Sequence, residues 1–209
     1  NTAIGSESGA DITTGDNNTA VGRKSLRSTT TGHSNVSLGN TTLCKNVTGT
    51  RNVGIGLSAL FNTLEDSNTA IGASAMAANT TGEYNVAVGD NSLTTNISAD
   101  RNTAVGFESL KVNTTGTSNV ANTAVGFSAL KTNTEGANNV AMGCGALCLS
   151  TTGAGNNAIG RNAMCANTTG SNNTAVGLQA LLANTEGDNN VAIGKQALDA
   201  NTTADNNTA

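Results

Sequence analysis

The feature that most constrains this chain is a five-residue motif, Asn-Thr-Ala-Val-Gly, which stands complete at Asn18–Gly22. Twelve copies or close variants begin between Asn1 and Asn190, and the step between them is seventeen residues almost everywhere. The step from Asn52 is sixteen residues, and an extra Asn119-Val120-Ala121 lengthens one other step by three. A fixed period held over so many copies indicates a solenoid, in which each repeat contacts only its neighbours. We therefore expect residues 1–209 to form a single repeat domain, a segment of a longer fibre.

The first five positions of the repeat have the pattern of a β-strand followed by a turn. Position 1 is always Asn, position 2 is Thr or Val in all copies but one, position 3 is small, position 4 is apolar and position 5 is always Gly. In a strand, positions 2 and 4 share one face and position 3 lies on the other. The glycine at position 5 permits the positive φ that a turn requires.

The rest of the repeat predicts a second strand and a second turn. Position 9 is Leu or Met in eleven of the twelve copies, position 13 is mostly Thr and position 15 is usually Gly. We expect the side chains at positions 9 and 13 to point inward. Two strands and two turns per repeat predict an all-β parallel β-solenoid, a two-strand-per-coil β-roll with about twelve coils. Coils stacked about 4.8 Å apart would make a rod of roughly 58 Å.

Three other folds compete with this interpretation. A three-sided β-helix stays open, although its apolar positions would be spread more evenly around the coil. A helical repeat is disfavoured, because two glycines per repeat each cost about 1 kcal/mol in a helix. Gly- and Asn-rich polar sequence is often disordered, but disorder does not explain apolar residues kept in register.

Each column of the stack has an expected role. The core stack is expected at positions 4 and 9, at Val21, Leu38, Ile55, Ile71, Val88, Val105, Val125, Ile159, Val176, Ile193, Leu26, Leu60, Leu93, Leu110, Leu130, Leu147, Leu181 and Leu198. The turn glycines are Gly22, Gly39, Gly56, Gly72, Gly89, Gly106, Gly126, Gly143, Gly160, Gly177 and Gly194. A ladder of stacked amides is expected at Asn18, Asn35, Asn52, Asn68, Asn85, Asn102, Asn122, Asn139, Asn156, Asn173 and Asn190; an alternative role for these residues is capping of turns in left-handed geometry.

The small residues at position 3 suggest that another backbone approaches closely. That backbone is either a neighbouring chain or the far wall of the same roll, and we favour a neighbouring chain because so narrow a core would be marginal alone. The expected interface residues are Ala20, Ala70, Ala87, Ala104, Ala124, Ala141, Ala158, Ala175 and Ala192.

The combination Asn-Thr-Ala-Val-Gly-x-x-Ala-Leu followed by Asn-Thr-Thr-Gly resembles the head repeats of YadA-like trimeric autotransporter adhesins. It is also similar to repeats of phage and bacterial tail-fibre-like proteins that end in a self-cleaving chaperone domain. The resemblance covers essentially the whole chain, from Asn1 to Ala209. It implies a left-handed β-roll that packs into a homotrimer. The repeat here is longer than in the adhesins, and we expect neither a coiled-coil stalk, a membrane anchor nor a chaperone domain within residues 1–209.

Composition and charge limit the kinds of molecule that we expect as partners of this chain. The formal net charge is −4, only 11% of residues are charged and aromatics make up 2%, so we expect no nucleic-acid partner. No apolar run approaches the ~20 residues that cross a bilayer, so no membrane insertion is expected in this segment, and no signal peptide is seen. The expected location is extracellular, on a cell or virion surface, with a homo-oligomer (trimer or filament) and a cell-surface or glycan receptor as partners.

The sequence offers little basis for catalysis or for a cofactor. The single histidine, His33, lies in a variable turn without a nucleophile arranged around it, and no enzyme activity is expected. Acidic residues recur at position 16, but Ca²⁺ roll repeats need several oxygen ligands per turn, so no metal and no cofactor is predicted. Cys148 and Cys165 share position 10 on adjacent coils. A separation of about 4.8 Å allows a disulfide, and a pair of free surface thiols is equally compatible.

Two functions follow from these observations. The first is a structural and adhesive fibre segment, a rigid rod whose variable turns present an extended surface. The second is ice binding through the threonine ladder at position 13, against which stand its expected inward orientation and its interruptions at Val47 and Ile97.

Overall fold

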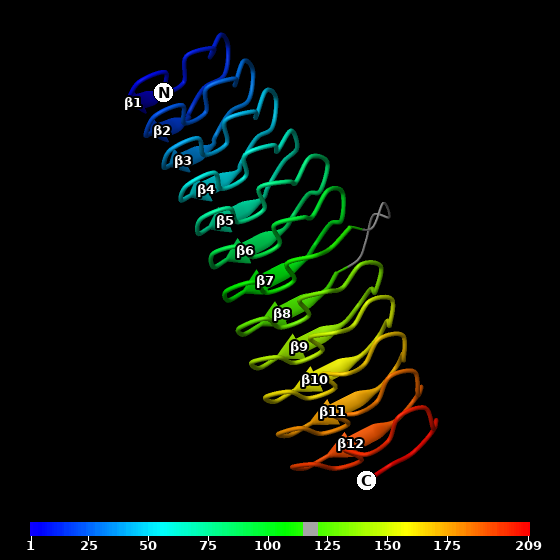
Figure 1. Cartoon of the computed structure of the whole chain (residues 1–209). Coiled ribbons are helices and arrows are strands. Elements are labelled where there is room, and N and C mark those ends of the chain that lie inside the picture. Colours follow the sequence, from blue (N-terminus) through cyan, green and yellow to red (C-terminus); the bar gives the residue numbers. More distant parts are fainter. Residues whose placement is uncertain (115–120) are drawn as a thin grey trace.

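The computed structural model describes residues 1–114 and 121–209, and its only regular elements in those ranges are twelve three-residue strands. They are β1 (Thr2–Ile4), β2 (Thr19–Val21), β3 (Val36–Leu38), β4 (Val53–Ile55), β5 (Thr69–Ile71), β6 (Val86–Val88), β7 (Thr103–Val105), β8 (Thr123–Val125), β9 (Val140–Met142), β10 (Asn157–Ile159), β11 (Thr174–Val176) and β12 (Val191–Ile193). All pair in parallel, in chain order, in one sheet. The coils stack into a rod with the two termini at opposite ends (Figure 1). The predicted all-β parallel β-solenoid is confirmed.

The two irregular steps leave the stack in register. Val53 of β4 still pairs with Thr69 of β5 across the sixteen-residue step. Thr103 of β7 pairs with Thr123 of β8 across the longest step. Of the extra residues, Asn119 and Val120 lie outside the described residues. The shorter and the longer step therefore both leave the pairing of the described strands unchanged.

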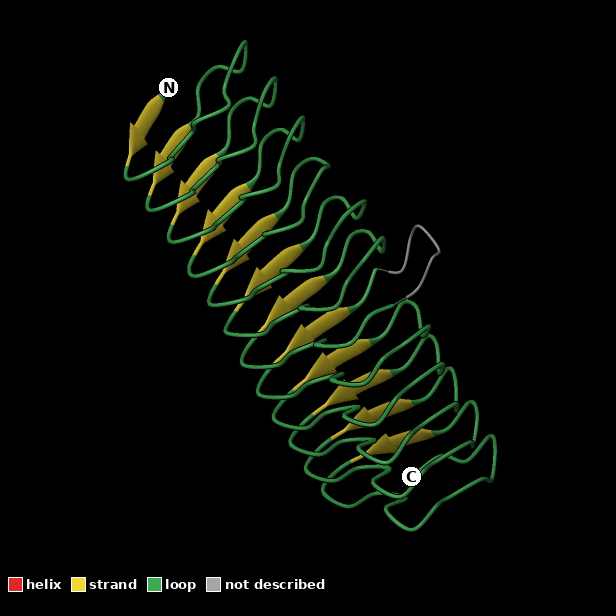
Figure 2. Ribbon diagram, turned by 45° about the horizontal axis from the view of Figure 1, so that its top comes forward, coloured by secondary structure: helices red, strands yellow, loops and turns green. Residues whose placement is uncertain are grey.

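The expected second strand is not formed in residues 1–114 and 121–209, where the coils close through turns and loops instead (Figure 2). Residues at positions 7 and 9 have left-handed backbones; in one coil, Glu108 has φ 53° and Leu110 has φ 46°. Such residues cannot continue an extended strand. Their amides still bond between coils, since Leu110 N–H donates to the Ala129 carbonyl at 2.9 Å and Glu108 N–H to the Asp90 carbonyl at 3.1 Å. The described residues contain no helix of the length and apolarity needed to cross a membrane.

The hydrophobic core is only a few side chains wide. It consists of the small residues at position 3, the small residues at position 8 and the Leu or Met at position 9. Fully buried leucines include Leu26, Leu60, Leu93, Leu110, Leu130, Leu147 and Leu181, and Leu198 packs against them partly buried. A typical coil therefore supplies one large apolar side chain and two small ones, whereas the first coil has Gly9 at position 9.

The expectation that position 3 faces a neighbouring chain is wrong, because the close neighbours are side chains on the far wall of the same roll. A Cβ added at Gly54, which occupies position 3, would lie 2.6 Å from the Thr42 methyl and 3.3 Å from Leu43 Cδ1. Only a small residue fits so near the turn opposite. The alanines of this column are at most 1% exposed: Ala20, Ala70, Ala87, Ala104, Ala124, Ala141, Ala158, Ala175 and Ala192.

The expectation that position 4 belongs to the core is wrong for the same reason. Strand side chains alternate, so an inward position 3 turns position 4 outward, and the thin interior has no room for a second large column opposite leucine. The residues concerned are half-buried or exposed: Val21, Leu38, Ile55, Ile71, Val88, Val105, Val125, Ile159, Val176 and Ile193.

Two asparagine ladders form the polar half of the interior. At position 1, the Oδ1 of each Asn accepts the backbone N–H of the Asn one coil further on, and its Nδ2 commonly donates to the position 15 carbonyl of its own coil. At position 12, Asn96 Nδ2 donates to Asn79 Oδ1 at 2.8 Å and to the Ala99 carbonyl at 3.0 Å. None of the position 1 residues has a positive φ, so they act as a ladder rather than as left-handed caps.

The second ladder has gaps where the sequence lacks asparagine. Asn133 Oδ1 is buried without a partner because the next coil carries Ser150 at position 12, whose own hydroxyl is also unpaired. Asn167, one coil further on, donates to the Gly170 carbonyl at 2.9 Å.

We expect Ser150→Asn to join the two ladder segments. The new amide would donate to Asn133 Oδ1 and accept from Asn167, and each net hydrogen bond adds about 1 kcal/mol. Chemical unfolding followed by circular dichroism should show a gain of about 1–2 kcal/mol. Ser171→Asn, in a half-buried turn, is the control with no expected gain; an equal gain there would contradict the ladder explanation.

Candidate interaction surfaces

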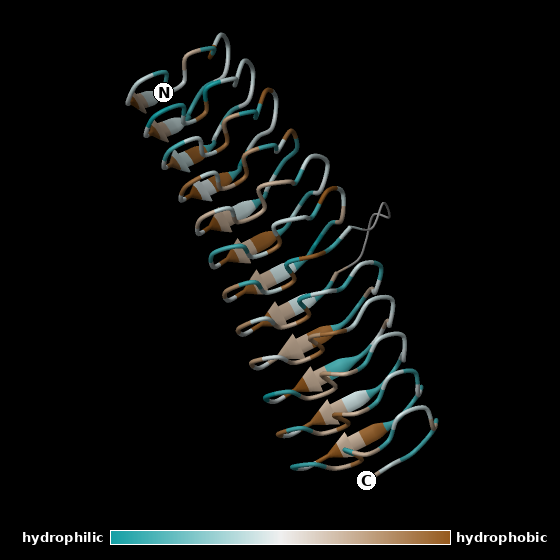
Figure 3. Ribbon diagram, viewed as in Figure 1, coloured by the Kyte–Doolittle hydropathy of each residue, from teal (hydrophilic) through white to brown (hydrophobic). Residues whose placement is uncertain are grey.

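The outer face of the sheet carries a continuous apolar stripe. It consists of the position 4 residues, flanked by Thr or Val at position 2. Ile71 is 37% exposed and Ile159 is 42% exposed, although neither residue lies in a terminal coil of the rod. Phe107 and Phe127, just beyond the strands on adjacent coils, stack with ring centroids 5.5 Å apart. In Figure 3 the strands carry most of the brown colour, whereas teal gathers in the turns. Most residues of this stripe are half-buried and several are exposed, and a contiguous apolar patch on a surface is typical of an interaction site.

The threonines at position 13 form a second ordered surface, and the expectation that they point inward is wrong. They are half-buried or exposed. Each hydroxyl donates to the position 13 carbonyl of the next coil, as from Thr151 to Thr168 at 3.1 Å and from Thr168 to Thr185 at 2.9 Å. The ladder is unbroken from Thr134 to Thr202. These hydrogen bonds give the side chains one common orientation.

The acidic residues at position 16 bond to backbone of the neighbouring coil. Asp100 Oδ1 accepts the Glu83 N–H at 2.9 Å, and Asp188 Oδ1 accepts the Ser171 N–H at 2.7 Å. Burial, reinforced by Glu65 and Asp100, raises the pKa of Glu83. No group of three or more metal-ligating side chains occurs in the described part of the chain. His33 is exposed and contacts the Ser34 hydroxyl at 3.4 Å.

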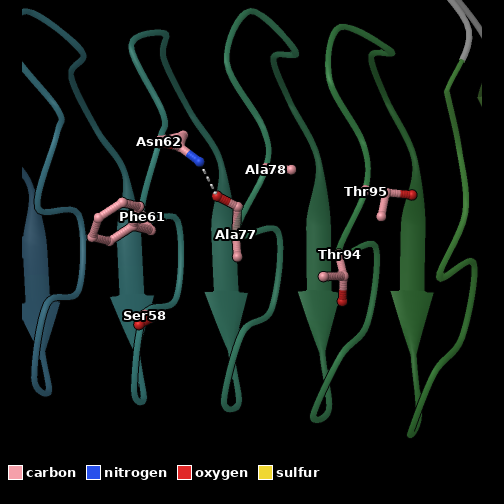
Figure 4. Close-up of a pocket in the computed structure, with 7 residues that line it drawn as sticks. All are labelled: Ser58, Phe61, Asn62, Ala77, Ala78, Thr94 and Thr95. Atoms are coloured by element: carbon pink, nitrogen blue, oxygen red, sulfur yellow. Dashed lines mark hydrogen bonds between the residues drawn. The ribbon is translucent and has the colours of Figure 1, made fainter.

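A shallow groove lies on the turn side of coils four to six (Figure 4). Its volume is about 290 Å³, and its lining is mostly apolar. The Phe61 ring forms one side and is contacted by Lys45 Nζ at 5.0 Å from the ring centroid. Ala77 and Ala78 belong to the next coil, and Thr94 to the one after it. The groove exists because one large residue at position 10 is followed by small ones.

The cysteines are free thiols. Cys148 and Cys165 stack on adjacent coils and share a side-chain hydrogen bond. That bond, together with the nearby Lys131 ammonium, lowers the pKa of Cys148 to about 6 although burial opposes the shift. The pKa of Cys165 is raised, because it is the donor of that bond and because it is half-buried. Cys44 is buried, and burial raises the pKa of its thiol.

The sequence pointed to the cysteine pair but missed its charged neighbours. Lys131 occupies position 10 on the coil before Cys148, and its Nζ lies 2.7 Å from Glu108 Oε2. Glu108 also binds Lys111 at 2.6 Å, and the two lysines lower the pKa of its carboxyl group. Reading position 10 as one column finds Lys111 and Lys131 beside the cysteines, but not Glu108, which lies at position 7.

The fold and these surfaces define the chain as a parallel β-solenoid repeat protein. No protein-family model, no curated protein and no solved structure matches it.

Proposed function

We propose that this chain is a non-catalytic structural segment of an extracellular fibre, in which three copies associate through the outer faces of their sheets. The observation that carries the proposal is the apolar stripe at position 4. It runs along the whole rod. Apart from the terminal coils, its most exposed residues include Ile71, Met142 and Ile159. Burial of such surface contributes about 25 cal/mol per Å².

The form of the stripe supports association with identical chains. Every coil presents the same kind of residue at the same place, so copies aligned along their axes bring each row against its own counterpart. Three parallel copies related by a three-fold axis place this row of each chain beside the axis, and such a rotation closes the assembly at three chains. The resemblance to adhesin head repeats favours three copies. The resulting stiff rod holds its variable turns away from a cell or virion surface, where they contact a receptor or glycan.

The test compares two matched double variants. We expect Ile71→Lys with Ile159→Lys to convert a trimer into a monomer, because charged side chains would be buried without partners. Val47→Lys with Ile97→Lys places the same charges at position 13, where the parent residues are 37% and 48% exposed, and should stay trimeric. Light scattering coupled to size exclusion gives the mass of each. A monomeric parent protein, or a trimer that survives the first pair, would contradict the proposal.

The outward threonine ladder favours ice binding as a second candidate. Its unbroken part from Thr134 to Thr202 presents regularly spaced hydroxyl and methyl groups. If this surface binds ice, the purified protein shows thermal hysteresis that Thr151→Lys with Thr168→Lys abolishes. Absence of hysteresis at millimolar concentration removes this candidate and leaves the fibre proposal untouched.

A further inference from the structure

Cys148 and Cys165 are placed as a pair by the backbone of the stack. Leu147 N–H donates to the Ala163 carbonyl at 3.0 Å, and Leu149 N–H donates to the Cys165 carbonyl at 3.1 Å. These two bonds flank Cys148 and fix it opposite Cys165. Both cysteines are half-buried, so part of each residue is open to solvent.

The surroundings of the pair favour one thiolate. Lys131 occupies the same column on the preceding coil, and its charge acts on Cys148. Glu108 fixes Lys131 in turn, with Nζ and Oε2 2.7 Å apart. A thiolate next to a cation and a second thiol is the arrangement of reactive, rather than structural, cysteines.

We propose that Cys148 and Cys165 form a dithiol modification site that low-molecular-weight disulfides oxidise to a covalent bridge between two adjacent coils. Cys148 is the attacking sulfur and Cys165 the resolving one. Neither the threonine ladder nor the apolar stripe takes part in this reaction.

The reaction consists of two exchanges. The Cys148 thiolate attacks one sulfur of the small disulfide, the S–S bond breaks, and a small thiolate leaves. Cys165 then gives its proton to solvent and attacks Cys148 Sγ, which releases the second small thiolate. Counted from the Cys148 thiolate and the Cys165 thiol, the protein loses two electrons and one proton, and the small disulfide takes up the two electrons and becomes two small thiolates. The spacing of adjacent parallel strands, about 4.8 Å, lies within the Cα separation that disulfides use.

The experiment treats the folded chain with oxidised glutathione at neutral pH, quenches free thiols, and maps tryptic peptides without reduction. Cleavage at Arg161 separates the two cysteines, so the bridge joins peptide 132–161 to peptide 162–195. Since Cys144 also lies in the first peptide, the reaction is repeated in Cys144→Ser, which should give the same joined pair. Cys148→Ser and Cys165→Ser should each abolish it. The product must migrate as a single chain on a non-reducing gel, which excludes a bridge between chains.

Phenylarsine oxide tests the pairing independently, because trivalent arsenic binds two neighbouring thiols and releases water. We expect one equivalent bound by the parent protein, by Cys44→Ser and by Cys144→Ser, and at least a tenfold loss of bound arsenic in Cys148→Ser and Cys165→Ser. The order of attack is tested with oxidised glutathione. Cys165→Ser, which keeps Cys148, should trap a mixed disulfide with glutathione, and Cys148→Ser should not. A mixed disulfide trapped on Cys165 and not on Cys148 would contradict this order. Failure to form the joined peptides, or equal arsenic binding by the two single variants and the parent, would overturn the proposal.

Discussion

Replacement of Gly106 by alanine is expected to be among the most destabilising single changes in this chain. Gly106 has φ +132°, and an added Cβ would lie 2.5 Å from the carbonyl oxygen and 2.7 Å from the carbonyl carbon of Gly126 on the next coil. Backbone strain and a backbone clash each cost about 1–3 kcal/mol. We expect a loss of about 3–5 kcal/mol in the free energy of unfolding, measured by urea titration followed by circular dichroism.

Replacement of Gly194 by alanine separates the cost of backbone strain from the cost of the clash with the next coil. It has φ +128°, but an added Cβ would meet nothing within 4 Å. Gly194→Ala should therefore cost only the strain, about 1–2 kcal/mol. If Gly106→Ala and Gly194→Ala lose the same free energy of unfolding, the close stacking of neighbouring turns does not contribute to stability.

The second large effect is expected from the first asparagine ladder. Asn139 is fully buried; its Nδ2 donates to the Gly153 carbonyl at 2.8 Å, and its Oδ1 accepts the Asn156 N–H at 2.9 Å. Asn139→Ala leaves both backbone groups buried without partners, at about 1–3 kcal/mol each. We expect a loss of about 2–5 kcal/mol, seen as a lower urea midpoint.

Two further variants test the reason for this loss. Asn139→Asp keeps the acceptor for Asn156 but removes the donor to Gly153, and it buries a carboxyl group, so it should not restore stability at neutral pH. Asn157→Ala removes an exposed amide from β10 and should change stability by less than about 0.5 kcal/mol. A loss at Asn157 comparable to that at Asn139 would contradict a specific role for the ladder.

The candidate surfaces were predictable only in part. The stacking of Cys148 on Cys165 follows from counting seventeen residues, because equal positions on adjacent coils must meet. The groove beside Phe61 does not follow from one repeat, since it depends on small residues at position 10 in two coils that come later. The outward threonine ladder was placed on the wrong side, because its orientation depends on how the coil closes.

The period of the sequence by itself determined the solenoid, the number of coils, the glycine turns and the columns of asparagine. These features need only that identical positions stack, which a repeat guarantees. What only the tertiary structure decided is which side of each strand faces inward. The alternation of side chains along a strand defines two faces but does not say which of them faces inward. The opposite wall decides this, because left-handed residues such as Leu110 bring the chain so close to the strand that only a small residue fits there.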